Sequence, residues 1–166
     1  MSINKSIVLV STGMVFALAS FGSTAHVLSG RLGALPDAKA RYSVNCAENR
    51  TQLVTRIAAR TKRDYLVELT VTKAGDVLLN PDASPSNLVR DPKSGDKPNQ
   101  KTGKGYSQIS RLAQGPGNYI MEIGKVKKSS TQKDAKLKGA MVFNVELHCQ
   151  DAAGNHSAGD TEVFPY

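Results

Sequence analysis

The fold class is decided by Met141–Gln150, which read MVFNVELHCQ. Every second side chain is apolar, and a period of two is typical of a β-strand with one buried face. The apolar positions are Met141, Phe143, Val145, Leu147 and Cys149, and the alternate positions are Val142, Asn144, Glu146, His148 and Gln150. We therefore expect a strand that turns Cys149 toward the core and His148 outward.

The same alternation occurs in other parts of the chain. Residues 65–72, YLVELTVT, and 119–123, YIMEI, place apolar side chains on one face, and 161–164, TEVF, predict a short final strand. The turn-forming residues 73–76 separate the first of these strands from the apolar residues 77–79. This arrangement predicts a hairpin.

Residues 51–60 fit two structures. The side chains of Leu53, Val54, Ile57 and Ala58 fit one face of a helix, whereas Leu53, Thr55 and Ile57 alternate as in a strand, which we favour. Several short strands with regular turns and no long helix predict an all-β protein. We expect an antiparallel β-sandwich, immunoglobulin-like or jelly-roll-like, with one disulfide.

The first 25 residues have the order of a secretory signal peptide. Lys5 precedes an apolar run of about fifteen residues, and Ser23 and Ala25 form a small-residue cleavage site. The run is shorter than the roughly twenty residues that cross a bilayer, so a retained anchor is the less favoured alternative. We expect cleavage before His26, no transmembrane segment afterwards, and a periplasmic or secreted protein.

The remaining chain has the length of one domain. Residues 26–41 contain Gly30, Gly33 and Pro36 and lack a sustained apolar period, so we expect a poorly ordered N-terminal linker. Residues 42–166 are then expected to form a single β-sandwich domain.

Both cysteines, Cys46 and Cys149, lie after the predicted cleavage site. Two cysteines in an exported protein most simply form a disulfide, and we predict the bond Cys46–Cys149. A reactive thiol pair or a metal site is the alternative. The sequence has no C-x-x-C motif, and only His148 lies beside either cysteine.

The chain is basic, with a formal net charge of +8. Two segments, 90–104 and 125–138, are rich in lysine and predict surface loops that bind anionic envelope glycans or lipopolysaccharide. The alternative is that these loops are only solvated. Neither segment has interleaved aromatic residues, which disfavours nucleic acid as a partner. The candidate anion-binding residues are Lys101, Lys104, Lys125, Lys127, Lys128, Lys133, Lys136 and Lys138.

Motifs of common enzymes are absent from the sequence. It has no G-x-S-x-G elbow, no H-E-x-x-H motif and no phosphate-binding glycine loop. We therefore expect no catalytic residue, no cofactor and no metal site. One alternative stays open: if their strands pair, His148 and His156 would form a surface metal site to which Glu146 adds a carboxylate.

Residues 66–126 resemble the bacterial pre-peptidase C-terminal (PPC) domain family. The resemblance is carried by VTKAGDVLLNPDAS at 71–84 and by LAQGPGNYIMEIGKV at 112–126. Ala83 stands where the family's turn usually has glycine, and Val77 stands where an acidic residue is common. Some members of the family bind calcium, but these departures leave no ligand set to carry over. The matching positions are Gly75, Asp76, Asn80, Pro81, Asp82, Gly117 and Tyr119.

The segment HCQDAAGNHSAGDTEVF at 148–164 is similar to the last hairpin of bacterial immunoglobulin-like domains. Both resemblances imply a β-sandwich that serves as a binding or accessory module. We therefore expect an exported, non-catalytic binding or accessory protein of the bacterial cell envelope. The alternative is a small secreted inhibitor or effector that binds a protein partner through the 90–104 loop.

Overall fold

The computed structural model describes residues 26–61, 63–75, 86–90, 99, 102–156 and 159–166. These residues form nine strands and one short 3-10 helix, η1. The elements are β1 (His26–Leu32), β2 (Ala40–Cys46), β3 (Gln52–Ala59), β4 (Leu66–Lys73), β5 (Ser86–Arg90), β6 (Ser110–Leu112), β7 (Gly117–Val126), η1 (Asp134–Leu137), β8 (Met141–Gln150) and β9 (Thr161–Pro165).

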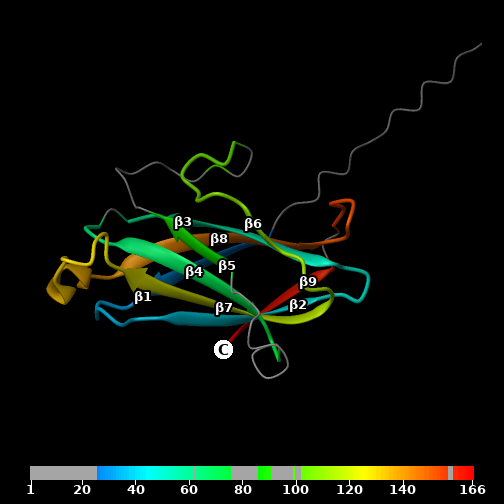
Figure 1. The fold of residues 1–166 in the computed structure, drawn as a ribbon, viewed down its shortest axis with the longest axis horizontal. Coiled ribbons are helices and arrows are strands. Elements are labelled where there is room, and N and C mark those ends of the chain that lie inside the picture. Colours follow the sequence, from blue (N-terminus) through cyan, green and yellow to red (C-terminus); the bar gives the residue numbers. More distant parts are fainter. Residues whose placement is uncertain (1–25, 62, 76–85, 91–98, 100–101, 157–158) are drawn as a thin grey trace, which may run out of the picture.

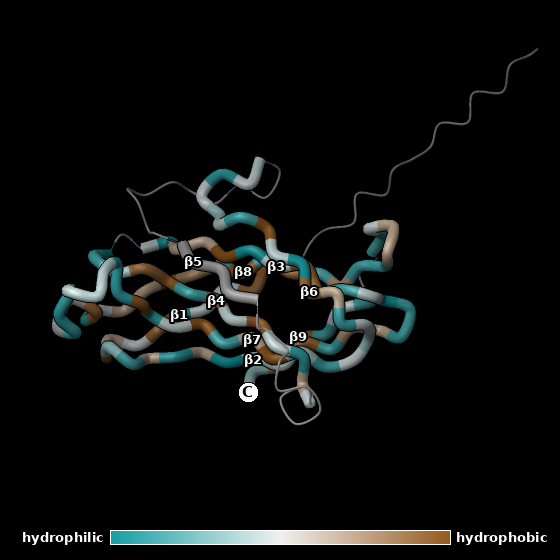
Figure 2. Tube along the Cα trace, viewed as in Figure 1, coloured by the Kyte–Doolittle hydropathy of each residue, from teal (hydrophilic) through white to brown (hydrophobic). Residues whose placement is uncertain are grey.

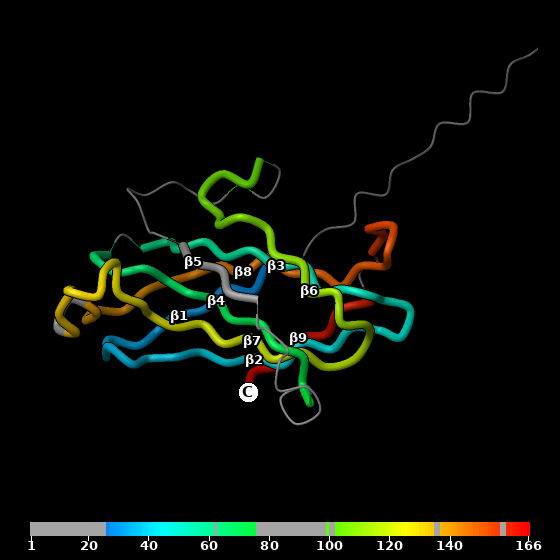
Figure 3. The backbone as a smooth tube through the Cα atoms, viewed as in Figure 1, coloured from blue at the N-terminus to red at the C-terminus, as the bar shows by residue number. Residues whose placement is uncertain are grey.

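The strands form two antiparallel sheets that pack face to face. One sheet has the order β1-β8-β3-β6, and the other has the order β5-β4-β7-β2-β9. Figure 1 shows β3 and β8 in one layer and β2 and β7 in the other, and Figure 3 traces how the chain passes between the layers. The predicted all-β sandwich is confirmed.

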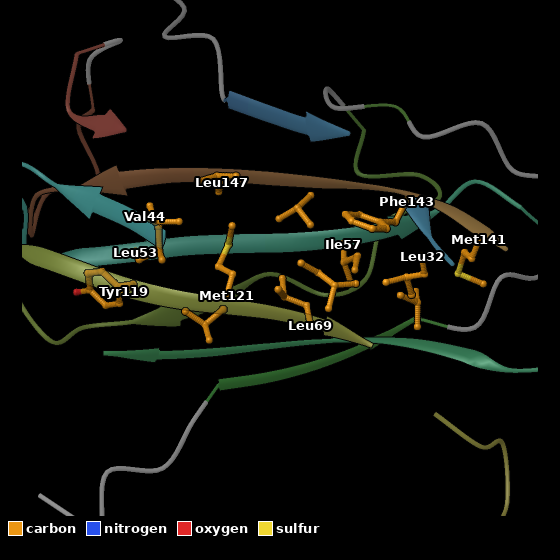
Figure 4. Close-up of a cluster of buried hydrophobic side chains, with 14 of the residues drawn as sticks. Leu32, Val44, Leu53, Ile57, Leu69, Tyr119, Met121, Met141, Phe143 and Leu147 are labelled. Carbon is orange, nitrogen blue, oxygen red and sulfur yellow. The ribbon is translucent and has the colours of Figure 1, made fainter. Parts of the chain in front are cut away.

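The core lies between the two sheets and is made by the alternating apolar positions. The inward side chains of β4, β7 and β8 are buried as the period of two predicts, and Figure 4 shows ten labelled residues of this cluster. Tyr65, Tyr119 and Phe143 are the largest fully buried side chains. The hydroxyl of Tyr65 donates to the carbonyl of Gly139 at 2.8 Å, so its polar end is satisfied. The connecting loops are mainly hydrophilic (Figure 2).

The predicted disulfide Cys46–Cys149 is also confirmed. It joins β2 in the five-stranded sheet to β8 in the four-stranded sheet, so it connects the two layers across the core. A disulfide is compatible with a protein that folds outside the reducing cytoplasm. No helix in the described ranges has the length and apolar character needed to cross a membrane.

The prediction of a linker over residues 26–41 is wrong. Residues 26–32 form β1, which pairs with β8 from His26–Leu147 to Leu32–Met141, and β2 begins at Ala40. Sequence periodicity missed β1 because Gly30 occupies one of its inward positions. A Cβ atom on Gly30 would lie 2.3 Å from Cζ of Phe143, so the large ring fills the space that glycine leaves.

The hairpin expected after β4 has only part of its length in the described residues. β4 pairs with β5, at residues 86–90, where periodicity placed no strand. Residues 77–79 and the predicted signal peptide, residues 1–25, lie outside the described residues. Residues 52–59 form β3, which confirms the strand that we favoured there.

Candidate functional site

The second lysine-rich segment lies at one end of the sandwich, between β7 and β8. It contacts the turn between β3 and β4, where Gln132 Nε2 donates to the carbonyl of Asp64 at 2.6 Å. Arg63 Nε donates to the carbonyl of Ala140 at 3.0 Å, which ties the same turn to the start of β8. The fold therefore adds Arg63 to the lysines of this segment.

We call this group of cations the basic end. Its side chains are exposed, apart from the half-buried Arg63, and the acidic residues of the two segments are Asp64 and Asp134. Lys127 pairs with Asp134 at 2.6 Å between Nζ and Oδ1. The excess of positive charge attracts polyanions, and salt screens that attraction over about 8–10 Å. The members of the basic end are Arg63, Lys127, Lys128, Lys133 and Lys138.

Lys125 does not belong to the basic end, although the sequence placed it in the anion-binding set. β7 continues to Val126, so Lys125 follows Tyr119, Met121 and Ile123 on the inward face. Its Nζ donates to the carbonyls of Gly33 and Leu35, both at 2.7 Å. Burial lowers the pKa of Lys125, and the nearby Arg63 adds to the effect. This lysine closes the end of the core.

The other predicted anion-binding residues either lie away from the basic end or are not among the residues that the structure describes. Lys104 is exposed and follows Gly103, which lies beside Arg56 over β3. Lys101 lies outside the described residues, as does most of the 90–104 loop, and the side chain of Lys136 is not described.

The end of the 90–104 loop leads into a segment that covers the outer face of β3. Ser107 N donates to the carbonyl of Ile57 at 2.7 Å, and the ring of Tyr106 lies 4.7 Å from Arg56 Cζ. Arg56 pairs with Glu146 at 2.7 Å beneath this ring. Glu146 is therefore paired with Arg56 on the outer face of β8.

His148 and His156 nevertheless lie together. Their rings stack with centroids 4.5 Å apart and planes inclined by 11°. His148 lies on the outer face of β8, as predicted, and His156 comes from the connection between β8 and β9. These two strands lie in different sheets, so the expected last hairpin at 148–164 is wrong: β9 pairs with β2. Burial is the main cause that lowers the pKa of His148 to about 4, followed by the charge of His156. In the described residues, no three His, Cys, Asp or Glu side chains are arranged to hold a metal ion.

A cleft of about 260 Å³ lies on the outer face of the five-stranded sheet. Glu122, in its floor, accepts hydrogen bonds from Lys39 at 2.5 Å and from Arg41 at 2.7 Å. These two cations lower the pKa of the Glu122 carboxyl. The cleft thus carries charges of both signs, which distinguishes it from the basic end. Its lining is Pro36, Asp37, Ala38, Lys39, Glu68, Thr70, Glu122, Gly124, Lys125 and Val126.

No protein-family model matches this chain, and no curated protein matches it. The resemblances to the PPC family and to bacterial immunoglobulin-like domains therefore stay predictions. The basic end is the surface on which several exposed cations meet.

Proposed function

We propose that this protein is an exported, non-catalytic binding protein of the bacterial cell envelope. It contacts anionic glycans or lipopolysaccharide through the basic end. The observation that carries the proposal is the meeting of the 60–64 turn with the 127–138 segment, tied by Gln132 and Arg63. Two cationic segments that are distant in the sequence become one surface.

Several exposed cations on one surface suit a ligand with several anionic groups. A single exposed ion pair contributes only about 0–1 kcal/mol, so one phosphate or carboxylate would bind weakly. A glycan that carries repeated phosphates or carboxylates meets Lys128, Lys133 and Lys138 together, and their contributions combine. The contacts remain exposed to solvent, so affinity is expected to fall as salt rises.

Two features support a localisation outside the cytoplasm. Residues 1–25 have the order of charge, apolar run and small residues that export signals share. The disulfide between Cys46 and Cys149 fits an oxidising compartment such as the periplasm or the medium.

The test is binding of the chain from His26 onward to purified lipopolysaccharide, with neutral dextran as the control glycan. The variant K128Q/K133Q/K138Q removes three exposed charges from the basic end. At about 0.5 kcal/mol per contact, we expect roughly tenfold weaker binding at low salt. The matched control R31Q/K104Q/R111Q removes three exposed charges elsewhere and is expected to bind as the parent chain does.

Two outcomes would contradict the proposal. Equal weakening in both triple variants would mean that net charge alone acts, without a site at the basic end. A single envelope protein retained through high salt, and lost when the 90–104 loop is cut, would favour the inhibitor or effector instead.

A further inference from the structure

The cleft on the outer face of the five-stranded sheet is hollow where a glycine lines it. In the ladder of β4 with β7, Glu68 is opposite Gly124. The next outward pair is Thr70 with Glu122. A Cβ atom on Gly124 would have only Lys39 Cγ within 4 Å, at 3.9 Å. The space next to Glu68 therefore lacks a side chain from β7.

One wall of the cleft is held in place by the protein itself. Residues 36–39, between β1 and β2, form this wall. Lys125 Nζ donates to the carbonyls of Gly33 and Leu35, both at 2.7 Å, and the N–H of Ala38 donates to the carbonyl of Leu35 at 3.2 Å. The volume of about 260 Å³ is several times that of a water molecule, roughly 30 Å³ in the liquid. The cleft is thus large enough for a small organic molecule.

The charged groups of the cleft differ in whether the protein already binds them. Glu122 is held by two cations. Lys125 donates to backbone carbonyls, and the exposed Asp37 is within electrostatic reach of its ammonium group. Glu68, by contrast, is half-buried and makes no hydrogen bond or ion pair with any described residue. A carboxylate that is partly removed from water gains from a cationic partner, so Glu68 is available to a positively charged ligand.

The lining of the cleft selects among cations. Divalent metal ions need several oxygen or nitrogen ligands, and the described residues contain no group of three His, Cys, Asp or Glu that could hold one. Quaternary ammonium groups are recognised by aromatic rings, whereas the described lining of the cleft has none. A primary ammonium group has three N–H donors, which the carboxylate of Glu68 and the hydroxyl of Thr70 accept.

We propose that this cleft binds an amino sugar, with the ammonium group of the sugar on Glu68. The sugar ring occupies the hollow over Gly124, where β7 offers no side chain. Lys39 uses one of its three donors on Glu122, so it can donate to the ring hydroxyls. This site goes beyond the proposed function, because it does not require that the basic end binds anionic glycans.

The experiment titrates D-glucosamine into the ¹⁵N-labelled chain from His26 onward and follows the amide signals by nuclear magnetic resonance. At mildly acidic pH, where the amine is protonated, we expect saturable shifts at Glu68, Thr70 and Gly124, with a Kd that is roughly millimolar. N-acetylglucosamine has the same ring but a neutral amide. It is expected to bind at least about tenfold more weakly, because the hydrogen bond between charged groups is lost.

Three variants locate the site. Glu68→Gln keeps the shape of the side chain and is expected to weaken glucosamine binding about tenfold. The matched control Glu162→Gln removes an exposed carboxylate from β9, in the same sheet but outside the cleft, and is expected to bind as the parent chain does. Gly124→Ala places a methyl group in the hollow at an ordinary distance from Lys39, so it is expected to fold normally and to lose binding.

Four outcomes would overturn part or all of this proposal. Equal binding of glucosamine and N-acetylglucosamine, or unchanged binding in Glu68→Gln, would remove the role of the ammonium group. Unchanged binding in Gly124→Ala would place the ligand elsewhere. Ethanolamine, an amine without a ring, would disprove the sugar if it bound as tightly as glucosamine. K128Q/K133Q/K138Q is expected to bind glucosamine like the parent chain whatever its effect on lipopolysaccharide, so the two proposals can fail separately.

Discussion

Gly30 is the position where one added methyl group should disturb the sandwich most directly. A Cβ atom there would lie 2.3 Å from Cζ and 2.8 Å from Cε2 of Phe143, and 2.9 Å from the hydroxyl of Tyr42. Phe143 is fully buried between the sheets, so its ring has no solvent to move into. The substitution Gly30→Ala therefore forces either the ring or β1 to shift by about an ångström.

The expected cost lies at the upper part of the usual range for overpacking, about 2–3 kcal/mol. Unfolding by guanidinium chloride of the oxidised protein measures it. For a domain of this size the slope is about 4 kcal/mol/M, so the midpoint should fall by roughly 0.5–0.8 M with an unchanged slope. Gly33→Ala is the matched control, because its Cβ would meet only Ala38 Cβ at an ordinary 3.6 Å.

A double variant tests the cause. In the background Phe143→Leu, which shortens the side chain, Gly30→Ala should cost less than about 1 kcal/mol, since the two positions are in contact. The reasoning is refuted if Gly30→Ala costs the same in both backgrounds, or if it costs no more than Gly33→Ala.

Three further predictions concern stability. Replacing both cysteines in C46A/C149A should lower the free energy of unfolding by about 2–4 kcal/mol, because a loop of 103 residues is released and the chain-entropy limit is about 4.7 kcal/mol; a loss below about 1 kcal/mol in guanidinium unfolding would contradict this. Lys125→Met should cost about 1–3 kcal/mol, because the carbonyls of Gly33 and Leu35 lose their donor, whereas the exposed Lys127→Met should cost under about 1 kcal/mol by the same assay. The lowered pKa of Glu122 means that its ionised form stabilises the fold above the ordinary carboxyl pKa and that this stabilisation is lost as pH falls through the lowered value. The Tm should therefore fall less steeply between neutral and acid pH for Glu122→Gln than for the parent chain. If the Tm of both proteins has the same pH dependence, Glu122 does not stabilise the fold in this way.

The sequence predicts the strands whose inward face is continuous. β4, β7 and β8 carry apolar alternation through their central residues, and the same parity places Cys149 where its disulfide forms. β1 was missed because Gly30 breaks the apolar pattern at the point where Phe143 fills the space. When a side chain from the neighbouring strand fills the space on the inward face, the strand itself lacks the apolar alternation that would predict it.

The candidate sites, too, are predicted from the sequence only in part. The run of exposed lysines can be recognised in the sequence, but Arg63 joins them through contacts between loops that lie far apart in the chain. Extending the parity of β7 by one step, from Ile123 to Lys125, would have shown that Lys125 points inward. The pairing of β1 with β8 was not predicted either, because periodicity missed β1.

The pairing of strands from distant parts of the chain also limits the order in which the protein can fold. β1 and β3 both require β8, and β2 requires β7 and β9, so neither sheet is complete until the last strands are present. Contacts between distant parts of a chain make folding slow, typically milliseconds to seconds for all-β domains. As the chain emerges from its N-terminus, the early strands have no partners and cannot close a core. Neither sheet can therefore be completed before the C-terminal strands β8 and β9 are present.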